Sequence, residues 1–132
     1  MDYSVEIERR FDAVAAAEPL PDGGFEIAGE AEDRALNVWV RFEVQVSGGT
    51  IGNVRFRVFG CPHTIAAASW IAEALRGAPA EALRGLDMER VRRELSIPRE
   101  KLGKLLRIED AVLACIEQIG PSARERATDA RR

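Results

Sequence analysis

The chain has 132 residues, of which 46% are hydrophobic, and a formal net charge of −3. This length and apolar content predict one globular domain, and the acidic balance argues against nucleic acid as a partner. No apolar run approaches the roughly 20 residues that cross a bilayer, so we expect no membrane contact. The charged start MDYSVEIERRF lacks a secretory h-region, and two cysteines are too few for a disulfide scaffold. These features predict a cytoplasmic protein with reduced thiols.

Periodicity in the first third of the chain predicts one helix and one short strand. Apolar residues at near-helical spacing indicate an amphipathic helix over residues 3–17. The segment PLPDGG, residues 19–24, ends that helix because proline and paired glycines interrupt periodic structure. A short strand, FEIAGE, is then expected over about 24–31.

The clearest pattern in the sequence is a pair of strands. Apolar and polar residues alternate along 36–47 and again along 50–59, as they do in strands with one buried face. Between these strands, Gly48 and Gly49 can adopt the positive φ that a tight hairpin turn needs. The side chains expected to face inward are Val38, Val40, Phe42, Val44, Val46, Val54, Phe56 and Val58.

The second half predicts the helical layer that such a one-sided sheet requires. Helices are expected over 63–76, 79–84, 87–95 and 99–119. Cys115 lies on the apolar stripe of the last helix, so we predict a core residue. The polar segment 121–132 is expected to be a disordered tail, which leaves one domain over 1–120. The predicted class is α+β, a three-stranded antiparallel sheet with helices packed on one face and an N-terminal helix first.

The joint between strand and helix, Gly60-Cys61-Pro62-His63, carries the side chains suited to chemistry. Pro62 fits the first position of a helix, which makes Cys61 the expected N-cap, where unpaired N–H groups and the helix dipole stabilise a thiolate. The alternative for Cys61 is a small buried apolar residue. His63 could face the same point as a metal ligand, or it could be a solvent-exposed polar residue. Two ligands fall short of the four that structural zinc takes.

These residues resemble the NifU N-terminal, or IscU-like, family of iron–sulfur cluster scaffolds. The most specific stretch is GGTIGNVRFRVFGCPHTIAAASWIAEALRG, and the sequence Ile108-Glu109-Asp110-Ala111 is similar to the family helix after its last ligands. The segment 97–101 is similar to the family's Leu-Pro-Pro-Val-Lys chaperone motif in Ile97, Pro98 and Lys101. The resemblance implies an IscU-like fold, a non-enzymatic role in cluster assembly, a cysteine desulfurase partner and an Hsp70-type chaperone.

The sequence departs from the family at its ligands. The family's Cys-Gly-Asp motif falls around Ala31-Glu32-Asp33, and its His-Cys pair falls on Gly103-Lys104. Of three ligand cysteines only Cys61 remains. The resemblance therefore implies Cys61 as sulfur acceptor or ligand, Asp33 as a hard metal ligand, and Glu32, Gly103 and Lys104 as neighbours of the site. His63 would then be a substitute metal donor. The implied cargo is an iron–sulfur cluster or iron, with zinc as a further metal.

Three functions are compatible with this sequence. The first is an iron–sulfur cluster assembly protein that accepts sulfur or iron at Cys61, where a homodimer pairing two Cys61–His63 sets would supply four donors for a cluster. The second is a ligand-poor relative that binds a cysteine desulfurase as a regulator without building clusters. The third is a thiol enzyme with His63 as base and Glu32 or Asp33 orienting it.

Overall fold

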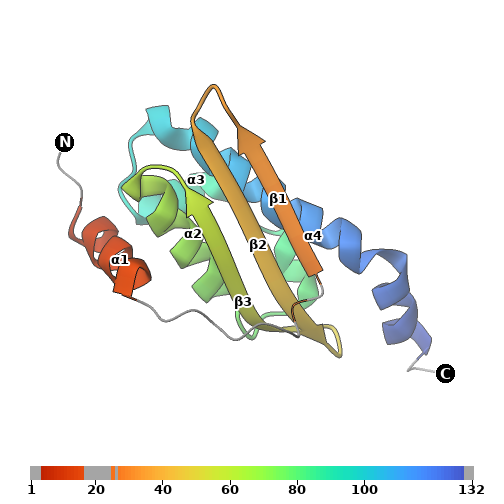
Figure 1. The fold of residues 1–132 in the computed structure, drawn as a ribbon. Coiled ribbons are helices and arrows are strands. Elements are labelled where there is room, and N and C mark those ends of the chain that lie inside the picture. Colours follow the sequence, from red (N-terminus) through yellow and green to blue (C-terminus); the bar gives the residue numbers. More distant parts are fainter. Residues whose placement is uncertain (1–3, 17–24, 26, 130–132) are drawn as a thin grey trace.

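The structure is a computed structural model that describes residues 4–16, 25 and 27–129 (Figure 1). The first residue of the predicted helix 3–17, its last residue, and the predicted strand start at 24 lie outside this described part. In chain order the elements are α1 (Val5–Ala16), β1 (Ile27–Asp33), β2 (Val38–Ser47), β3 (Thr50–Phe59), α2 (Pro62–Leu75), the 3-10 helix η1 (Ala80–Arg84), α3 (Met88–Glu94), the 3-10 helix η2 (Arg99–Lys101) and α4 (Leu102–Asp129). The predicted α+β class with its N-terminal helix first is confirmed.

The sheet has the predicted antiparallel pairing, in the order β1-β2-β3. Gly48 and Gly49 adopt φ values of 60° and 77° in the turn between β2 and β3, which is the left-handed backbone that glycine permits without steric cost. This turn fixes the register that sets Phe42 opposite Phe56 and Val44 opposite Val54. The rings of Phe42 and Phe56 stack with centroids 5.8 Å apart.

Helices cover one face of the sheet, as predicted. Helix α2 packs against β3, α4 packs against β1 and β2, and α1 rests on α2 (Figure 1). Five of the eight side chains predicted to face inward are fully buried, and the other three, Val46, Phe56 and Val58, are partly buried against the same core. The helices contribute the rest of the core, which includes Ile71, Leu75, Leu83, Val91, Leu105, Ile108, Val112 and Cys115.

The other face of the sheet carries paired charges and no helix within the described residues (Figure 1). Glu30 accepts hydrogen bonds from the Trp39 indole at 2.7 Å and from Arg41 at 3.0 Å. Glu43 pairs with Arg55 at 2.9 Å, and this guanidinium holds the pKa of the Glu43 carboxyl below its usual range despite partial burial. Cross-strand pairs of this kind stabilise an exposed sheet face.

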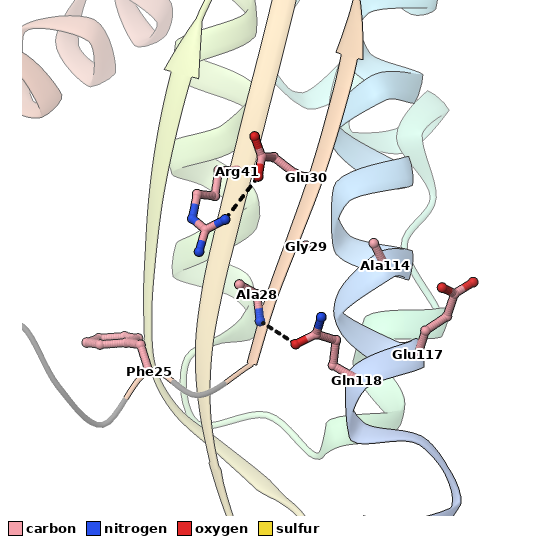
Figure 2. Close-up of a pocket in the computed structure, with 8 residues that line it drawn as sticks. All are labelled: Phe25, Ala28, Gly29, Glu30, Arg41, Ala114, Glu117 and Gln118. Carbon is pink, nitrogen blue, oxygen red and sulfur yellow. Dashed lines mark hydrogen bonds and ion pairs between the residues drawn. The ribbon is translucent and has the colours of Figure 1, made fainter.

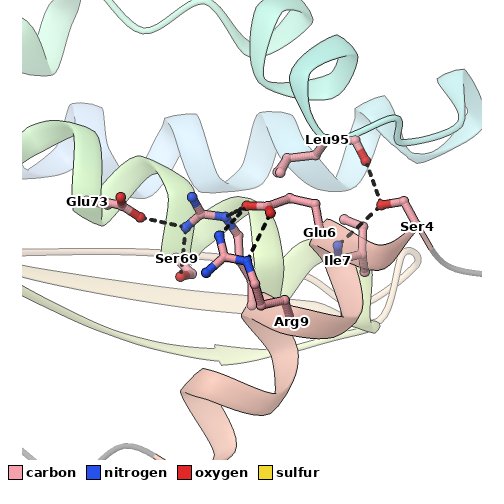
Figure 3. A network of polar contacts seen from close by, with 8 residues as sticks. Ser4, Glu6, Ile7, Arg9, Ser69, Glu73 and Leu95 are labelled. Carbon is pink, nitrogen blue, oxygen red and sulfur yellow. Dashed lines mark hydrogen bonds and ion pairs between the residues drawn. The ribbon is translucent and has the colours of Figure 1, made fainter.

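Polar contacts and one buried side chain hold α1 in place (Figure 3). The Ser4 hydroxyl caps the helix by accepting from the Ile7 N–H at 3.2 Å and donates to the Leu95 carbonyl at 3.3 Å. Ile7 is fully buried. The guanidinium of Arg10, itself mostly buried, donates to Glu73 on α2 at 2.8 Å. The helix predicted near the N-terminus is therefore an integral part of the fold.

Helix α4 departs from the predicted bounds at both ends. Residues 99–101 form η2 where the first turn of the long helix was expected, and α4 continues past residue 119 to Asp129. The division into a domain over 1–120 and a polar tail over 121–132 stays a prediction, and residues 130–132 lie outside the described part. None of the helices in the described part is both long enough and apolar enough to span a membrane.

Gly29, in the middle of β1, lets α4 approach the sheet very closely (Figure 2). A Cβ atom built on Gly29 would lie 2.0 Å from the Ala111 carbonyl oxygen and 2.7 Å from the Cys115 backbone nitrogen. Both are backbone atoms of a helix, which cannot move aside individually. Only glycine therefore fits between β1 and α4 at this point.

We expect Gly29→Ala to lower the free energy of unfolding by about 1–3 kcal/mol or more, since about 1–3 kcal/mol is the usual cost of an overpacked core. The matched control is Gly52→Ala on β3, where a Cβ would meet nothing closer than 3.8 Å. That variant should be as stable as wild type or more stable by up to about 1 kcal/mol, since alanine lowers the conformational entropy of the unfolded chain. Urea unfolding of the two variants measures the difference, and equal midpoints would contradict the packing described for α4.

Candidate functional site

Three segments that are distant in sequence meet at one end of the sheet. Strand β1 and strand β3 both end there, and α4 begins there. A Cβ on Gly103 would contact the Leu36 side chain at 3.4 Å, which places the first turn of α4 beside the β1–β2 turn. The charge of Lys104 in the same turn acts on the Cys61 thiol. The fold thus brings Cys61 and Lys104 to the same end of the sheet as Asp33.

Cys61 is the N-cap residue of α2, as predicted. Its backbone is extended, with φ −79° and ψ 166°, and Pro62 occupies the first helical position. The Sγ atom makes no capping hydrogen bond within ordinary limits, but it lies 3.5 Å from the Thr64 hydroxyl. Cys61 is partly exposed, so the alternative of a buried apolar residue is wrong.

The surroundings of Cys61 favour its thiolate. Burial acts to raise the pKa of the thiol, but the Thr64 hydroxyl and N–H, the charge of Lys104 and the His63 N–H together outweigh burial and lower that pKa. The lowered pKa agrees with the prediction made from the helix start. A thiolate is the form of cysteine that attacks sulfur and binds metal.

His63 lies inside the fold. Its side chain is 3% exposed, so the expectation of a solvent-exposed polar residue is wrong. The reason is tertiary packing, because the His63 side chain points from the first turn of α2 into the protein and not into solvent. Burial, with the nearby charges of Lys101 and Lys104, lowers the pKa of the imidazole and favours its neutral form.

Asp33 and Glu32 are committed to other contacts. One carboxylate oxygen of Asp33 accepts from the Leu36 N–H at 3.1 Å and closes the β1–β2 turn, and the other lies 4.0 Å from Arg107. Glu32 pairs with Arg34 at 3.2 Å on the surface. Neither carboxylate is among the groups that shift the pKa of Cys61 or of His63.

Within the described ranges no group of three or more histidine, cysteine or acidic side chains could together hold a metal ion. The roles predicted for Cys61, His63 and Asp33 as joint ligands therefore stay predictions. What this end of the sheet does provide is one partly exposed thiol with a lowered pKa and a lysine beside it.

The segment similar to a chaperone motif is tied into the fold. Ile97 is 1% exposed, its N–H donates to the Arg92 carbonyl at 2.9 Å and its own carbonyl accepts from the Arg92 guanidinium at 3.0 Å. Pro98 caps η2, which ends at Lys101. Recognition of Ile97, Pro98 and Lys101 by a chaperone stays a prediction. A chaperone could contact the Ile97 side chain only if that side chain left the core.

The sequence did not identify Thr64 as a contributor to the site, and it identified Lys101 only as part of the chaperone-like segment. Thr64 contacts the Cys61 sulfur, and Lys101 acts on His63. Thr64 could have been found, because a side chain three residues after an N-cap lies beside the capping group. The effect of Lys101 on His63 could not, since it depends on tertiary packing that brings η2 near the start of α2.

Cys115 is a core residue, as predicted. It is fully buried, its thiol donates to the Phe42 carbonyl at 3.5 Å, and burial raises its pKa to about 12. The two cysteines of the chain therefore differ in both access and thiolate content.

A small alkylating reagent should modify Cys61 and leave Cys115 unmodified in the native protein. The rate should rise with pH about a midpoint below the roughly 8.5 of a free cysteine. Lys104→Gln should move that midpoint upward, because removing a positive charge disfavours the thiolate. Lys101→Gln is the control, since Lys101 acts on His63 and is not among the charges that shift Cys61. Mass spectrometry of alkylation at several pH values measures both midpoints, and equal shifts in the two variants would contradict this electrostatic account.

Comparison with known proteins places these features in a family. A relative named iron sulfur cluster assembly protein 1, mitochondrial, from Eremothecium gossypii is 37% identical over 97 residues, which are 70% of this chain and 60% of the relative. The iron-sulfur cluster assembly scaffold protein IscU of Rickettsia prowazekii is 35% identical over 66 residues, half of each chain. The crystal structure of an N-terminal NifU-like protein from Brucella abortus has a TM-score of 0.70 at 18% identity and covers 88% of this chain and 92% of its own, which shows a shared fold.

The comparisons contradict the predicted cytoplasmic location. Relatives from Eremothecium gossypii, Kluyveromyces lactis and Saccharomyces cerevisiae are all named as mitochondrial proteins. The cytoplasmic assignment rested on the low cysteine content and on the lack of a secretory h-region. Those features argue only against an oxidising or secreted location, so they could not support the cytoplasm in particular.

The family match extends over most of the fold. Residues 23–123 match the NifU-like N terminal domain, a range that contains the whole sheet, α2, α3 and the junction that carries Cys61. The predicted resemblance is confirmed by this match and by the relatives above. The chain belongs to the family of NifU-like N-terminal domains.

Proposed function

We propose that this chain is an iron–sulfur cluster assembly protein whose Cys61 accepts sulfur. The observation that carries the proposal is the state of Cys61: in a domain of this family, it is a partly exposed helix N-cap whose thiol has a lowered pKa. The chain spans 60% of one named relative and half of another. The role is that of a sulfur acceptor and carrier, not of an enzyme.

The sulfur would come from a persulfide carried by a cysteine desulfurase. The Cys61 thiolate attacks the outer sulfur of that persulfide, a new bond forms from Sγ to this sulfur, and the S–S bond of the donor breaks. The electron pair of the broken bond leaves with the donor thiolate. The exchange therefore needs no added oxidant or reductant. Lys104 would favour both the attacking thiolate and the anionic persulfide that results.

A cluster, as the cargo of such a protein, would need donors from outside one chain. Cluster iron is usually held by four cysteines, and the described part of this chain offers Cys61 as its only accessible thiol. A homodimer that pairs two Cys61–His63 sets, or a second assembly protein, would supply the missing donors. Iron or zinc bound by Cys61, His63 and Asp33 alone would be held weakly, because soft metal sites favour thiolates.

A second function is favoured by the missing ligands themselves. Since the described residues contain no three-donor group, the chain could bind a desulfurase as a regulator without accepting sulfur. This alternative leaves the lowered pKa of Cys61 without a use. The proposal of an Hsp70-type chaperone as a further partner is based on the similarity of residues 97–101 to a chaperone motif.

Incubation with a cysteine desulfurase and free cysteine should add one sulfur atom to Cys61 and none to Cys115. The expectation follows from the lowered pKa of the first thiol and the burial of the second. Mass spectrometry of the intact protein and of its peptides measures the transfer. Cys61→Ser should abolish it, and Cys115 serves as the internal control. A wild-type Cys61 that binds the desulfurase but never carries sulfur would favour the regulator instead.

Restoring family-type ligands should convert the site into a metal site. Gly103 accepts a side chain, since its Cβ would make only an ordinary contact with Leu36. We expect the double variant Gly103→His, Lys104→Cys to bind iron at least about tenfold more tightly than wild type, because it adds an imidazole and a thiolate near Cys61. Leu113→Cys, which adds an exposed thiol about 15 Å farther along α4, is the control.

Anaerobic titration with ferrous iron, followed by metal analysis and visible absorption after addition of sulfide, measures this gain. The gain should disappear when Cys61→Ser is added to the double variant. An unchanged iron affinity in the double variant would mean that the start of α4 does not share a site with Cys61.

A further inference from the structure

The strand that leads into Cys61 carries an exposed aromatic side chain on the uncovered face of the sheet. Phe59 is 64% exposed, the most exposed aromatic residue in the described part of the chain. It stands two residues before Cys61 and directly opposite Trp39 in the β2–β3 register. The Trp39 indole is held in place by its 2.7 Å hydrogen bond to Glu30. Two aromatic side chains therefore mark the end of the sheet where the thiol emerges.

A cation that forms no ion pair within the described part of the chain lies next to these aromatic residues. Arg57 shares the outward face with Phe59, because alternate residues of a strand point the same way, and it is exposed. Its cross-strand neighbour is Arg41, which already pairs with Glu30 and Glu43. Arg57 forms no ion pair with any residue that the structure describes. We call Trp39, Arg57 and Phe59 the aromatic–arginine strip.

The charge around Cys61 extends this pattern. Lys104, in the first turn of α4, lies close enough to influence the thiol. The acidic side chains beside Trp39 are already engaged: Glu30 accepts from the Trp39 indole and pairs with Arg41, and Glu32, opposite Trp39, pairs with Arg34. The approach to Cys61 thus combines an exposed aromatic side chain with the cations Arg57 and Lys104, while the carboxylates beside Trp39 already have partners. A complementary partner surface must be apolar with carboxylates beside it.

We propose that the aromatic–arginine strip is the docking surface for the sulfur donor, and that the donor, a cysteine desulfurase, meets it with an apolar side chain flanked by acidic residues. This inference rests on the proposed function, because it names the surface that presents the donor persulfide to Cys61. Phe59 would be buried at the centre of the contact, where aromatic side chains supply most of the binding energy. Arg57 would pair at the rim and speed association.

The test measures binding in a Cys61→Ser background, so that its outcome does not depend on sulfur transfer. Phe59→Ser should weaken binding of the cysteine desulfurase from the same organism by about tenfold or more, as expected for a central aromatic contact. Arg57→Glu should weaken it by about fivefold, mainly through a slower association rate, and should reduce the dependence of that rate on salt. Surface plasmon resonance at two salt concentrations gives both quantities.

Two matched controls separate the strip from general surface effects. Leu113→Ser removes an apolar side chain of 40% exposure from α4, and Arg93→Glu reverses an exposed charge on α3. Both should bind the desulfurase as the parent does. Thermal melting of all four variants checks that they fold. If Phe59→Ser or Arg57→Glu fails to melt cooperatively, Phe59→Leu or Arg57→Gln takes its place and should also weaken binding.

Each outcome decides the inference. If strip variants bind the desulfurase as tightly as the controls do, the inference is wrong. It is also wrong if Phe59→Ser abolishes self-association of the chain, measured by analytical ultracentrifugation, without weakening desulfurase binding, because the strip then contacts a second copy. Wild-type protein is tested separately for persulfidation of Cys61 by inorganic polysulfide. If Cys61 takes up no sulfur from polysulfide while the desulfurase still binds the strip, the proposed function is wrong and the docking surface is still supported.

Discussion

The close approach of α4 to β1 at Gly29 is the contact on which the site depends. A helix is stiff, so the point where its backbone touches the strand also determines where its first turn lies. With the Ala111 carbonyl set against Gly29, that first turn places Gly103 beside the β1–β2 turn and Lys104 near Cys61. A side chain at position 29 would displace the whole helix. The chemistry at one end of the sheet is therefore set by a glycine in the middle of its edge strand.

The replacement of ligands by Lys104 changes which charges the site favours. Two soft donors at 103 and 104, as the family resemblance implies, would attract a metal cation. A lysine ammonium repels a cation and attracts the negative charge of a thiolate or a persulfide. Cys61 keeps the helix start and the Thr64 contact that favour its thiolate. The same position in the fold is thereby better suited to holding sulfur than to holding iron.

Much of this could be predicted because it depends on local pattern. Period-two alternation and the Gly48–Gly49 turn determine the register, and Pro62 marks the helix start that makes Cys61 an N-cap. The burial of His63 could not be predicted, since a residue in the first turn of a helix faces either solvent or protein according to how neighbouring helices pack. The influence of Lys104 on Cys61 joins residues from two separate helices, so it could be expected from the family resemblance but not from local pattern.

The state of His63 favours a carrier over a thiol enzyme. A cysteine–histidine enzyme uses its imidazole as the base that activates the thiol, and the resulting imidazolium then stabilises the thiolate. Burial and two nearby lysines lower the pKa of His63 and disfavour that imidazolium. Glu32 and Asp33, the carboxylates that could have oriented the ring, are engaged with Arg34 and with Leu36 and Arg107. The thiolate of Cys61 is thus stabilised by the helix start, Thr64 and Lys104, which suits a residue that receives sulfur from a partner.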